Sequence, residues 1–307
     1  MRESLLQADG RIRRDEEVVA AFVAAARADS ALSEIVEAIE DAPMAIGTDG
    51  VLLRGRLRSS GQPVVVKLNA QPGERAWLPA VGAVDPSIVP AVFGIGEVVG
   101  ALELPWLCME LLPAGPPGFA GPEWYDPLMA AAIPWQSAAA RVSLPPAVEI
   151  NVEWFRFWLD AGLDFDPSDD LRRLRQRLDD DWAFIESTCD AAIAHGDVHF
   201  FNVGSRRSSP DALVLFDPHA WRAPWPFDGA YCETLTHLCL KPDHGAPLVE
   251  RLAALRRDQG LPTPGPAEVA RASRIMCAWL AVMWRTLFRD TAPERPATTA
   301  AYVAAAV

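Results

Sequence analysis

The sequence predicts an α+β fold in two lobes, a smaller β-rich lobe followed by a larger and mainly helical one. Apolar residues alternate with a period of two from Val51 and return in short apolar runs as far as Leu112. The run that follows, residues 113–123, is rich in glycine and proline, which is typical of a linker. Beyond it, apolar residues recur mostly at helical spacing. We therefore expect an N-terminal lobe at residues 1–112 and a C-terminal lobe at residues 113–307.

The N-terminal lobe is expected to begin with helices and continue as a sheet. Residues 15–40 have apolar side chains at mostly helical spacing, which predicts one or two helices. Residues 52–58 alternate between the two faces of a strand, and Ser-Ser-Gly-Gln then turns the chain into VVVKL, so a β-hairpin follows the loop IGTDG. A short helix at residues 74–84 and strands at residues 91–98 and 105–112 complete the predicted lobe.

The C-terminal lobe is predicted to be helical apart from two short strands. VEWFRFWLDAG at residues 152–162 is one helix candidate, and residues 170–188 form another. The second candidate places five apolar side chains on one stripe: Leu171, Leu174, Leu178, Trp182 and Ile185. The apolar runs AAIA and ALVLFD predict strands at residues 191–194 and 212–217. The last third of the chain is helical again, with breaks at PDHGAP and PTPGP.

Composition excludes several classes of protein. The formal charge of −13 and a pI near 4.8 disfavour a nucleic-acid partner, although a cationic small molecule remains compatible. The five cysteines are scattered and contain no CxxC pair, which argues against a disulfide framework or a structural zinc site. No uncharged apolar run reaches the roughly 18 residues that a membrane span requires. We therefore expect a cytoplasmic protein with no membrane partner, and the sequence leaves the oligomeric state open.

The motif AHGDVHFFNV at residues 194–203 has the composition of a phosphotransferase loop. Phosphoryl transfer needs a carboxylate that orients the attacking hydroxyl group, together with oxygen ligands for Mg²⁺. Asp197 and Asn202 stand five positions apart, the spacing of a kinase catalytic loop. Asp217 ends the next predicted strand, where a second metal-binding carboxylate should emerge. Upstream, Lys67 lies in the middle of the strand VVVKL, as a lysine that contacts nucleotide phosphates should.

These residues resemble a known family. AHGDVHFFNV together with FDP at 216–218 looks like the HGDxHxxN…D signature of the aminoglycoside phosphotransferase family, small-molecule kinases with a two-lobed protein-kinase-like fold. The resemblance covers roughly residues 45–290 and is closest in motif to the branch of streptomycin and hydroxyurea kinases. It implies ATP or GTP as phosphoryl donor, Mg²⁺ as cofactor, and a small-molecule hydroxyl group as acceptor.

The resemblance also assigns roles to single residues. Asp197 would be the catalytic base, Asn202 and Asp217 would hold Mg²⁺, and Lys67 would contact the nucleotide phosphates. The hinge that meets the nucleotide base would be MELL at residues 109–112, which contains Met109 and Leu111.

Two departures from the family leave the acceptor open, Cys232 and the loop HAWRAPWP at residues 219–226, which is longer and richer in tryptophan than in the family. Trp221 and Trp225 of this loop are candidates for substrate contact. Cys232 stands where the family has a second aspartate after Asp-Pro. The glycine-rich loop is degenerate as well, because IGTDGVLLRG has glycines at 47, 50 and 55 but no G-x-G-x-x-G. Among acceptors, an aminoglycoside-type antibiotic is the family's first suggestion, and a sugar, an amino alcohol or a nucleoside is the alternative.

The sequence allows two interpretations for several side chains. Glu74 is either the acidic partner of Lys67 or a first-turn helix charge. His199 either supports the catalytic loop or contacts substrate, whereas His195 is expected to support the loop. Asp228 and Glu233 are substrate candidates, although Asp228 could instead cap a helix that begins near Gly229.

Two other functions remain as alternatives to a kinase. A catalytically silent nucleotide-binding protein would fit the degenerate loop and Cys232. A metal-dependent hydrolase would use the histidines and the aspartate of HGDxH as ligands, although the other histidines show no recognised ligand spacing.

Overall fold

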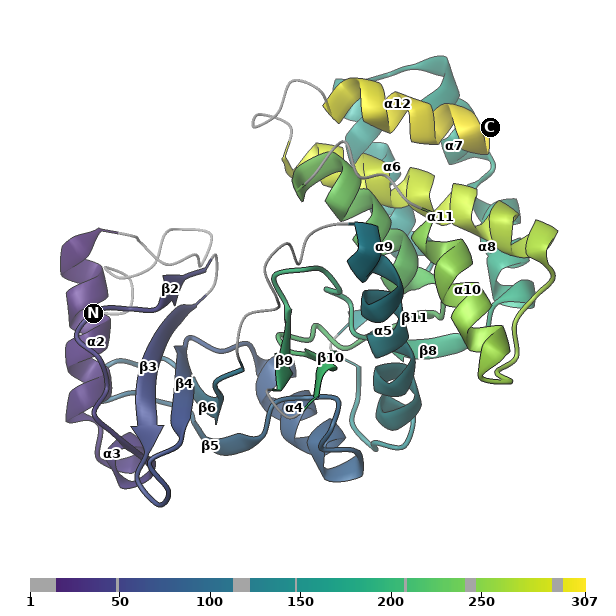
Figure 1. Ribbon diagram of the computed structural model, residues 1–307. Coiled ribbons are helices and arrows are strands. Elements are labelled where there is room, and N and C mark those ends of the chain that lie inside the picture. The colour runs from purple at the N-terminus through teal and green to yellow at the C-terminus, as the bar shows by residue number, and fades with distance from the viewer. Residues whose placement is uncertain are drawn as a thin grey trace. The chain divides into compact units, whose positions relative to one another are not determined.

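The computed structural model describes residues 15–47, 50–112, 122–146, 148–206, 209–240, 247–288 and 295–307. The chain divides into two units, residues 1–113 and 114–307. The first is built around an antiparallel sheet and the second mainly from helices, as Figure 1 shows. The fold class is therefore α+β, as the sequence predicts.

The N-terminal unit begins with two helices, α2 (Glu16–Ala28) and α3 (Ser30–Ile35), where residues 15–40 predict one or two. Aspartate begins each of them. The side chain of Asp15 accepts a hydrogen bond from the amide of Val18, and that of Asp29 accepts one from the amide of Leu32. Such a cap satisfies an amide that has no partner inside the helix. Local sequence therefore sets where both helices start.

Within residues 15–47 and 50–112, six strands form one antiparallel sheet. Their bounds are β1 (Val36–Glu37), β2 (Ala45–Ile46), β3 (Val51–Leu57), β4 (Pro63–Leu68), β5 (Val92–Gly96) and β6 (Trp106–Glu110). The order across the sheet is β1-β3-β4-β6-β5, and β2 also pairs with β3. The predicted hairpin is β3 and β4. In β4, Lys67 lies opposite Leu52 on one side and Leu107 on the other, so it occupies the interior of the sheet.

The side chains on the two faces of β4 have different surroundings. Val64, Val66 and Leu68 belong to the core that also includes residues of α2 and α3. Because side chains alternate along a strand, Lys67 points to the opposite face. Helix α4 (Pro72–Val84) lies on that face, and its Glu74 reaches the Lys67 amine. Lys67 thus lies on the face of the sheet opposite to α2 and α3.

Long helices make up most of the described part of the C-terminal unit. They are α5 (Tyr125–Ala139), α6 (Val152–Phe165), α7 (Asp169–Gln176), α8 (Leu178–Thr188), α9 (Phe227–Leu235), α10 (Leu248–Asp258), α11 (Pro266–Leu287) and α12 (Arg295–Ala306), with a 3-10 turn at Pro122–Trp124 and a π-helical turn at Thr236–Leu240. Helix α11 packs against α6, α9, α10 and α12. Its Trp279 is fully buried, with a ring centroid 4.6 Å from that of Phe155 in α6. The core of the unit therefore forms around α11.

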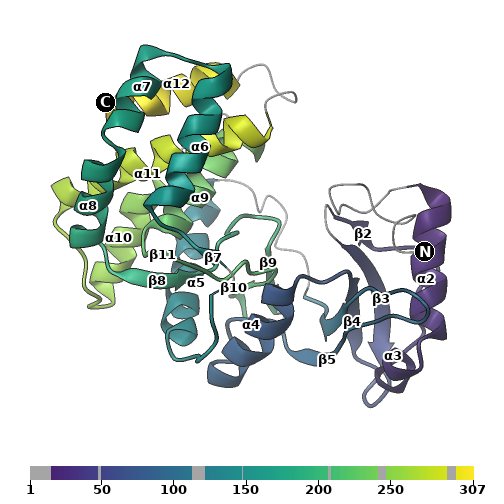
Figure 2. The same cartoon turned by 180° about the vertical axis from the view of Figure 1, so that it is seen from behind.

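Short strands frame the polar motif. Strands β7 (Val148–Glu149), β11 (Trp221–Pro224) and β8 (Ala191–Ala194) form one small sheet in that order, while β9 (Val203–Arg206) and β10 (Ser209–Leu215) form a hairpin (Figure 2). The loop with Asp197 and Asn202 lies between β8 and β9. Asp217 follows β10 and precedes β11. Two loops that are separate in sequence are thereby brought to neighbouring strand ends.

The single helix predicted over residues 170–188 is wrong, because α7 ends and α8 begins at Arg177. The predicted apolar stripe is nevertheless buried along its whole length. The Arg177 amide still donates to the Arg173 carbonyl at 3.1 Å, so the backbone stays close to helical at this position. Its guanidinium donates to Asp181 at 3.1 Å and to the Ala306 carbonyl of α12 at 2.9 Å. A tertiary contact that sequence periodicity does not reveal therefore accompanies the break.

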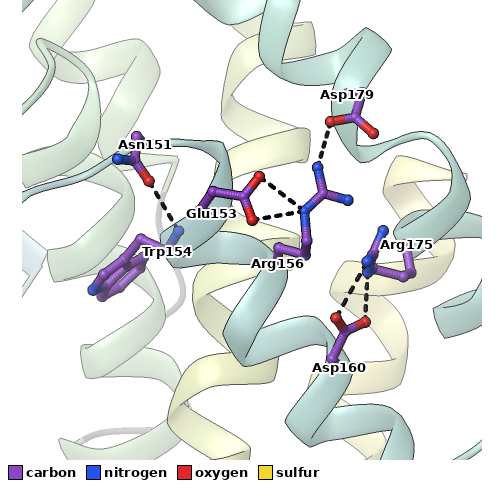
Figure 3. Close-up of polar contacts among 7 residues, drawn as sticks. All are labelled: Asn151, Glu153, Trp154, Arg156, Asp160, Arg175 and Asp179. Carbon is purple, nitrogen blue, oxygen red and sulfur yellow. Dashed lines mark hydrogen bonds and ion pairs between the residues drawn. The ribbon is translucent and has the colours of Figure 1, made fainter.

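Ion pairs connect α6 to the two helices that follow it (Figure 3). Arg156 of α6 contacts Asp179 of α8 at 2.6 Å, and Asp160 of α6 contacts Arg175 of α7 at 2.5 Å. The aspartates are more than half exposed, so solvent screens both pairs and they contribute little to stability. Asn151 begins α6 with a side-chain cap. These contacts orient the surface of the unit, while the apolar core supplies its stability.

Two further expectations concern the chain as a whole. No described helix combines the length and apolar composition needed to cross a membrane. All five cysteines are free thiols, and all except Cys239 are buried. Their main contribution is therefore packing of the two cores.

Candidate active site

The N-terminal unit contributes a buried ion pair. Lys67 Nζ lies 2.8 Å from Glu74 Oε2, and the side chains are 7% and 0% exposed. Glu74 lies in the first turn of α4, and Lys67 lies in β4. Between the two interpretations of Glu74, the structure thus forms the pair with Lys67. A buried carboxylate beside the amine fixes where the positive charge is held, which is what a phosphate-binding lysine requires.

Gly50 packs directly against this lysine. A methyl group added to Gly50 would lie 3.1 Å from Lys67 Cε and 3.0 Å from the carbonyl oxygen of Leu68. The absence of a side chain at this position therefore lets the loop approach β4. Of the degenerate glycine loop, Gly47 and Gly50 are described, and their backbones are joined by a 2.9 Å hydrogen bond. Thr48 and Asp49 lie outside the described residues.

The predicted hinge residues lie at the end of β6. Met109 is buried, with β4 on one side and β5 on the other. Leu111 follows the end of the strand, and its amide donates to the Pro63 carbonyl at 3.4 Å. A nucleotide contact at Met109 and Leu111 remains a prediction.

In the C-terminal unit, a buried aspartate holds the backbone of residues 195–202, the candidate catalytic loop. Asp228 of α9 is fully buried and accepts hydrogen bonds from the amides of His195 (3.1 Å) and Gly196 (2.9 Å). The Gln136 side chain of α5 donates to it at 3.0 Å. Burial raises the pKa of the Asp228 carboxyl to about 6, against the opposing effect of these hydrogen bonds. Asp228 therefore ties α5 and α9 to the start of the loop.

This placement bears on both interpretations of Asp228 and contradicts the helix cap. A residue with no exposed surface and both oxygens hydrogen-bonded is at odds with the predicted substrate contact. It does not cap a helix either, because α9 begins at Phe227 with Pro226 at the cap position. Sequence alone offers an acidic residue after Asp-Pro, but it cannot reveal that the partners of this residue are amides 32 and 33 positions upstream.

His195 and Gly196 shape the loop. His195 is fully buried, and burial lowers its pKa to about 3, so the ring is neutral. It packs edge-on against Trp135, with ring centroids 4.9 Å apart. Gly196 has φ +81°, and a methyl group there would lie 3.0 Å from the His219 Cβ and 3.2 Å from the Trp221 ring. Glycine is thus required in this loop both by backbone conformation and by space.

The carboxylate of Asp197 is held on both oxygens. Its Oδ2 accepts from Asn202 Nδ2 at 2.6 Å, and its Oδ1 accepts from the Tyr231 hydroxyl group at 3.0 Å. His199 Nε2 lies 3.3 Å from Oδ1. Burial by itself would raise the pKa of Asp197, yet the hydrogen bond from His199 holds it below its usual range. The carboxylate is therefore ionised and available to accept a proton.

Asn202 and Asp217 are brought together by backbone contacts. The Phe216 amide donates to the Asn202 carbonyl at 3.0 Å, which places Asp217 directly after a residue bound to the catalytic loop. Asp217 has φ +60°, an unusual conformation for a non-glycine residue that costs on the order of 1 kcal/mol and is found mainly at functional sites. In the described residues no group of three or more His, Cys, Asp or Glu side chains could hold a metal ion. An amide oxygen and a carboxylate oxygen are nonetheless the hard ligands that suit Mg²⁺ when phosphates and water complete its shell.

Glu233 accepts its hydrogen bonds from residues of the C-terminal unit. It accepts from the Leu248 amide at 2.8 Å, at the start of α10, and from the Tyr302 hydroxyl group of α12 at 3.4 Å. Burial raises the pKa of this carboxyl to about 7. These contacts connect three helices, and they do not favour the predicted substrate contact.

Tyr231 is a site residue that sequence reasoning passed over. It stands beside Cys232, in the stretch that departs from the family pattern, but nothing in the sequence indicates that its hydroxyl group meets Asp197. The contact spans 34 positions, and it depends on how α9 packs beneath the loop. Trp225, in the loop after Asp217, is fully buried, and the Arg256 guanidinium lies over its ring.

No family model and no curated protein matches the sequence. Solved structures match along almost the whole chain. A choline/ethanolamine kinase family protein from Mesorhizobium loti has a TM-score of 0.62 at 14% identity, over 93% of this chain and 98% of that one. An aminoglycoside phosphotransferase from Alicyclobacillus acidocaldarius has a TM-score of 0.56 at 14% identity, over 90% and 92%. An ethanolamine kinase from Plasmodium vivax has a TM-score of 0.56 at 10% identity, over 97% and 90%.

These structures and this protein share a fold in which an antiparallel sheet is followed by a mainly helical part. It is similar to the fold shared by aminoglycoside phosphotransferases and choline kinases, at low sequence identity. Because both groups match about equally well, the comparisons do not single out the streptomycin and hydroxyurea kinase branch that the motif resembles.

Proposed function

We propose that this protein is an ATP-dependent phosphotransferase that moves the γ-phosphoryl group to a hydroxyl group of a small molecule. The observation that supports it most strongly is the hydrogen bond between Asp197 and Asn202, with Asp217 following a strand bound to the same loop. An ionised carboxylate is thereby fixed beside the Asn202 side chain, and Asp217 follows a residue that is bound to the same loop. This is the arrangement that phosphoryl transfer requires from a protein, since positioning and electrostatics supply most of the catalysis.

Each residue has a role in this proposal. Asp197 orients the acceptor hydroxyl group and accepts its proton, and Lys67 contacts the nucleotide phosphates while Glu74 holds the amine in place. Asn202 and Asp217 would hold Mg²⁺, which neutralises charge that develops on the phosphates. Met109 and Leu111 contact the base of ATP, or of GTP if the donor differs.

The contacts of the predicted acidic substrate residues bear on the acceptor. An aminoglycoside is a polycation, and Asp228 and Glu233 were the carboxylates that the sequence offered for it. Both are occupied by amides or by Tyr302. This favours an acceptor with less positive charge, such as a sugar, an amino alcohol or a nucleoside, over an aminoglycoside-type antibiotic.

The test is a screen of nucleotide turnover and product mass with these four acceptor classes side by side. Asp197→Asn keeps the shape of the side chain, and we expect it to slow transfer by roughly a hundredfold to ten-thousandfold, the range of general-base catalysis. Asp164→Asn makes the same chemical change at an exposed position of α6 and should leave transfer intact. Equal activity of wild type and Asp197→Asn would refute the proposal. Nucleotide binding without turnover of any acceptor would favour a catalytically silent protein instead.

The nucleotide role of Lys67 has its own test. Lys67 and Lys241 are the only lysines in the sequence. An acyl-phosphate derivative of ATP, which transfers its acyl group to an amine near the phosphates, should label Lys67, and excess ATP should protect it. Labelling of Lys241 alone, read by peptide mass spectrometry, would contradict the role.

A further inference from the structure

The two oxygens of the Asp197 carboxylate have different surroundings. Oδ1 receives the Tyr231 hydroxyl group at 3.0 Å and faces His199 Nε2 at 3.3 Å. Oδ2 receives Asn202 Nδ2 at 2.6 Å. A carboxylate oxygen has two lone-pair sites. Two groups that can donate therefore approach Oδ1, whereas one donor reaches Oδ2.

The tautomer of His199 follows from its other ring nitrogen. Nδ1 accepts a hydrogen bond from the Phe201 amide at 3.1 Å, so it cannot itself hold a proton. In the neutral ring the proton must then reside on Nε2, the nitrogen that faces Asp197. His199 is consequently a donor to Oδ1, set by a backbone contact within its own loop.

Tyr231 is held as firmly from the other side. Its side chain is 4% exposed, and its ring meets that of Trp284 in α11 edge-on at 5.0 Å and that of Trp221 at 6.1 Å. Burial and then the negative charge of Asp197 raise the pKa of the phenol, so it stays protonated. The hydroxyl group is therefore a permanent donor whose direction is set by the packing of α9 against α11.

We infer that Tyr231 and His199 are positioning residues that immobilise Oδ1 of Asp197, so that Oδ2 is the oxygen that receives the proton of the acceptor. This rests on the proposed phosphotransferase function. In the transfer, the acceptor oxygen forms a bond to the γ-phosphorus of the nucleoside triphosphate. The bond from that phosphorus to the β–γ bridging oxygen breaks, and its electron pair leaves with the nucleoside diphosphate. The acceptor proton passes to Oδ2.

Tyr231 and His199 hold Oδ1 from two different parts of the C-terminal unit. Tyr231 fixes Oδ1 through the core of the helical unit, and His199 fixes it through the loop. With both in place the carboxylate cannot rotate about its Cβ–Cγ bond to exchange its oxygens. An acceptor hydroxyl group then meets Oδ2 in one orientation, and correct orientation of the base is worth more to the rate than to substrate binding.

The test compares two tyrosines. Tyr231→Phe removes the hydroxyl group that meets Asp197, and Tyr302→Phe removes the hydroxyl group of a half-buried tyrosine, which meets Glu233 in α9. We expect Tyr231→Phe to lower kcat roughly tenfold, as the loss of a hydrogen bond to a charged group does, with the KM for ATP unchanged. Tyr302→Phe should leave kcat unchanged. If the two variants lower kcat and thermal stability alike, Tyr231 is merely structural and the inference fails.

His199 gives a test by rescue. His199→Ala should lower kcat roughly tenfold, and His199→Gln, whose amide nitrogen can replace Nε2 as donor, should restore most of the loss. Equal losses in the two variants would contradict a positioning role. Nitrogen-15 NMR of the wild-type imidazole should show the proton on Nε2, and a proton on Nδ1 would overturn the inference without reference to turnover. If the tautomer is as expected and no acceptor is phosphorylated, the proposed function fails while the contact to Oδ1 stands.

Discussion

Lys67 in β4 and Glu74 in α4 form a buried ion pair, with 2.8 Å between Nζ and Oε2. The chain has 28 lysines and arginines, of which arginine supplies all but Lys67 and Lys241. Lys67 is the one lysine among the described residues. The carboxylate of Glu74, which has no exposed surface, lies beside it. Burial of both charges is costly, and a functional role of the amine would account for its retention.

Lys67→Met should destabilise the protein, because it leaves Glu74 buried without its partner. We expect a loss of about 3–5 kcal/mol in the free energy of unfolding, measured by urea denaturation. The double variant Lys67→Met/Glu74→Gln should recover most of that loss while nucleotide binding stays abolished. A double variant no more stable than the single one would show that the cost does not come from the unpaired carboxylate.

Gly50→Ala should weaken nucleotide binding without unfolding the protein. The added methyl group would press on Lys67 Cε and on the Leu68 carbonyl, so the amine must shift. We expect the Kd for ATP to rise roughly tenfold by calorimetry, the equivalent of about 1.4 kcal/mol. Gly47→Ala is the matched control, since its methyl group would meet nothing closer than 3.5 Å. An equal effect of both variants would argue against contact with Lys67 as the cause.

Gly196→Ala should be the more damaging of two substitutions at positive φ. Gly61 has φ +71° with open space around it, so Gly61→Ala imposes backbone strain alone, about 1 kcal/mol. Gly196 adds crowding against His219 and Trp221 to a similar strain. We expect a loss of about 2–4 kcal/mol for Gly196→Ala by thermal unfolding, together with loss of transfer. Comparable losses at both sites would mean that the crowding is relieved at no cost.

Glu233→Gln should change how stability depends on pH. The pKa of Glu233 is raised from its ordinary value of 4.5 to about 7. Between these values the folded protein holds a proton that the unfolded chain releases, so this contribution is full below pH 4.5 and is lost as pH rises to 7. We expect it to amount to about 3 kcal/mol.

The measurement is the free energy of unfolding at pH 4.5 and at pH 7. It should decline less in Glu233→Gln than in wild type across this interval. Glu186→Gln, at an exposed position of α8, should follow wild type. A wild-type decline in Glu233→Gln would assign the effect to another group.

Local signals in the sequence were enough to predict most of the elements. The apolar run VVVKL predicted a strand with Lys67 inside it, and the spacing of Asp197 and Asn202 predicted one loop between two strands. Strand period and loop spacing are properties of neighbouring residues, so they can be read without knowledge of the fold. The break at Arg177 could not be predicted, because its guanidinium contacts a helix more than a hundred residues away.

The sequence by itself determined the fold class, the order of the elements and the candidates for base, metal and phosphate contacts. Only the tertiary structure decided what the other polar residues do. In the folded protein, Asp228 accepts a hydrogen bond from the backbone of the candidate catalytic loop, and Glu233 accepts one at the start of α10. The Tyr231 hydroxyl group donates to Asp197. A buried carboxylate must find donors wherever packing places them, and those donors lie 15 to 34 positions away in the chain. Such partners are set by how helices pack, which no short stretch of sequence specifies.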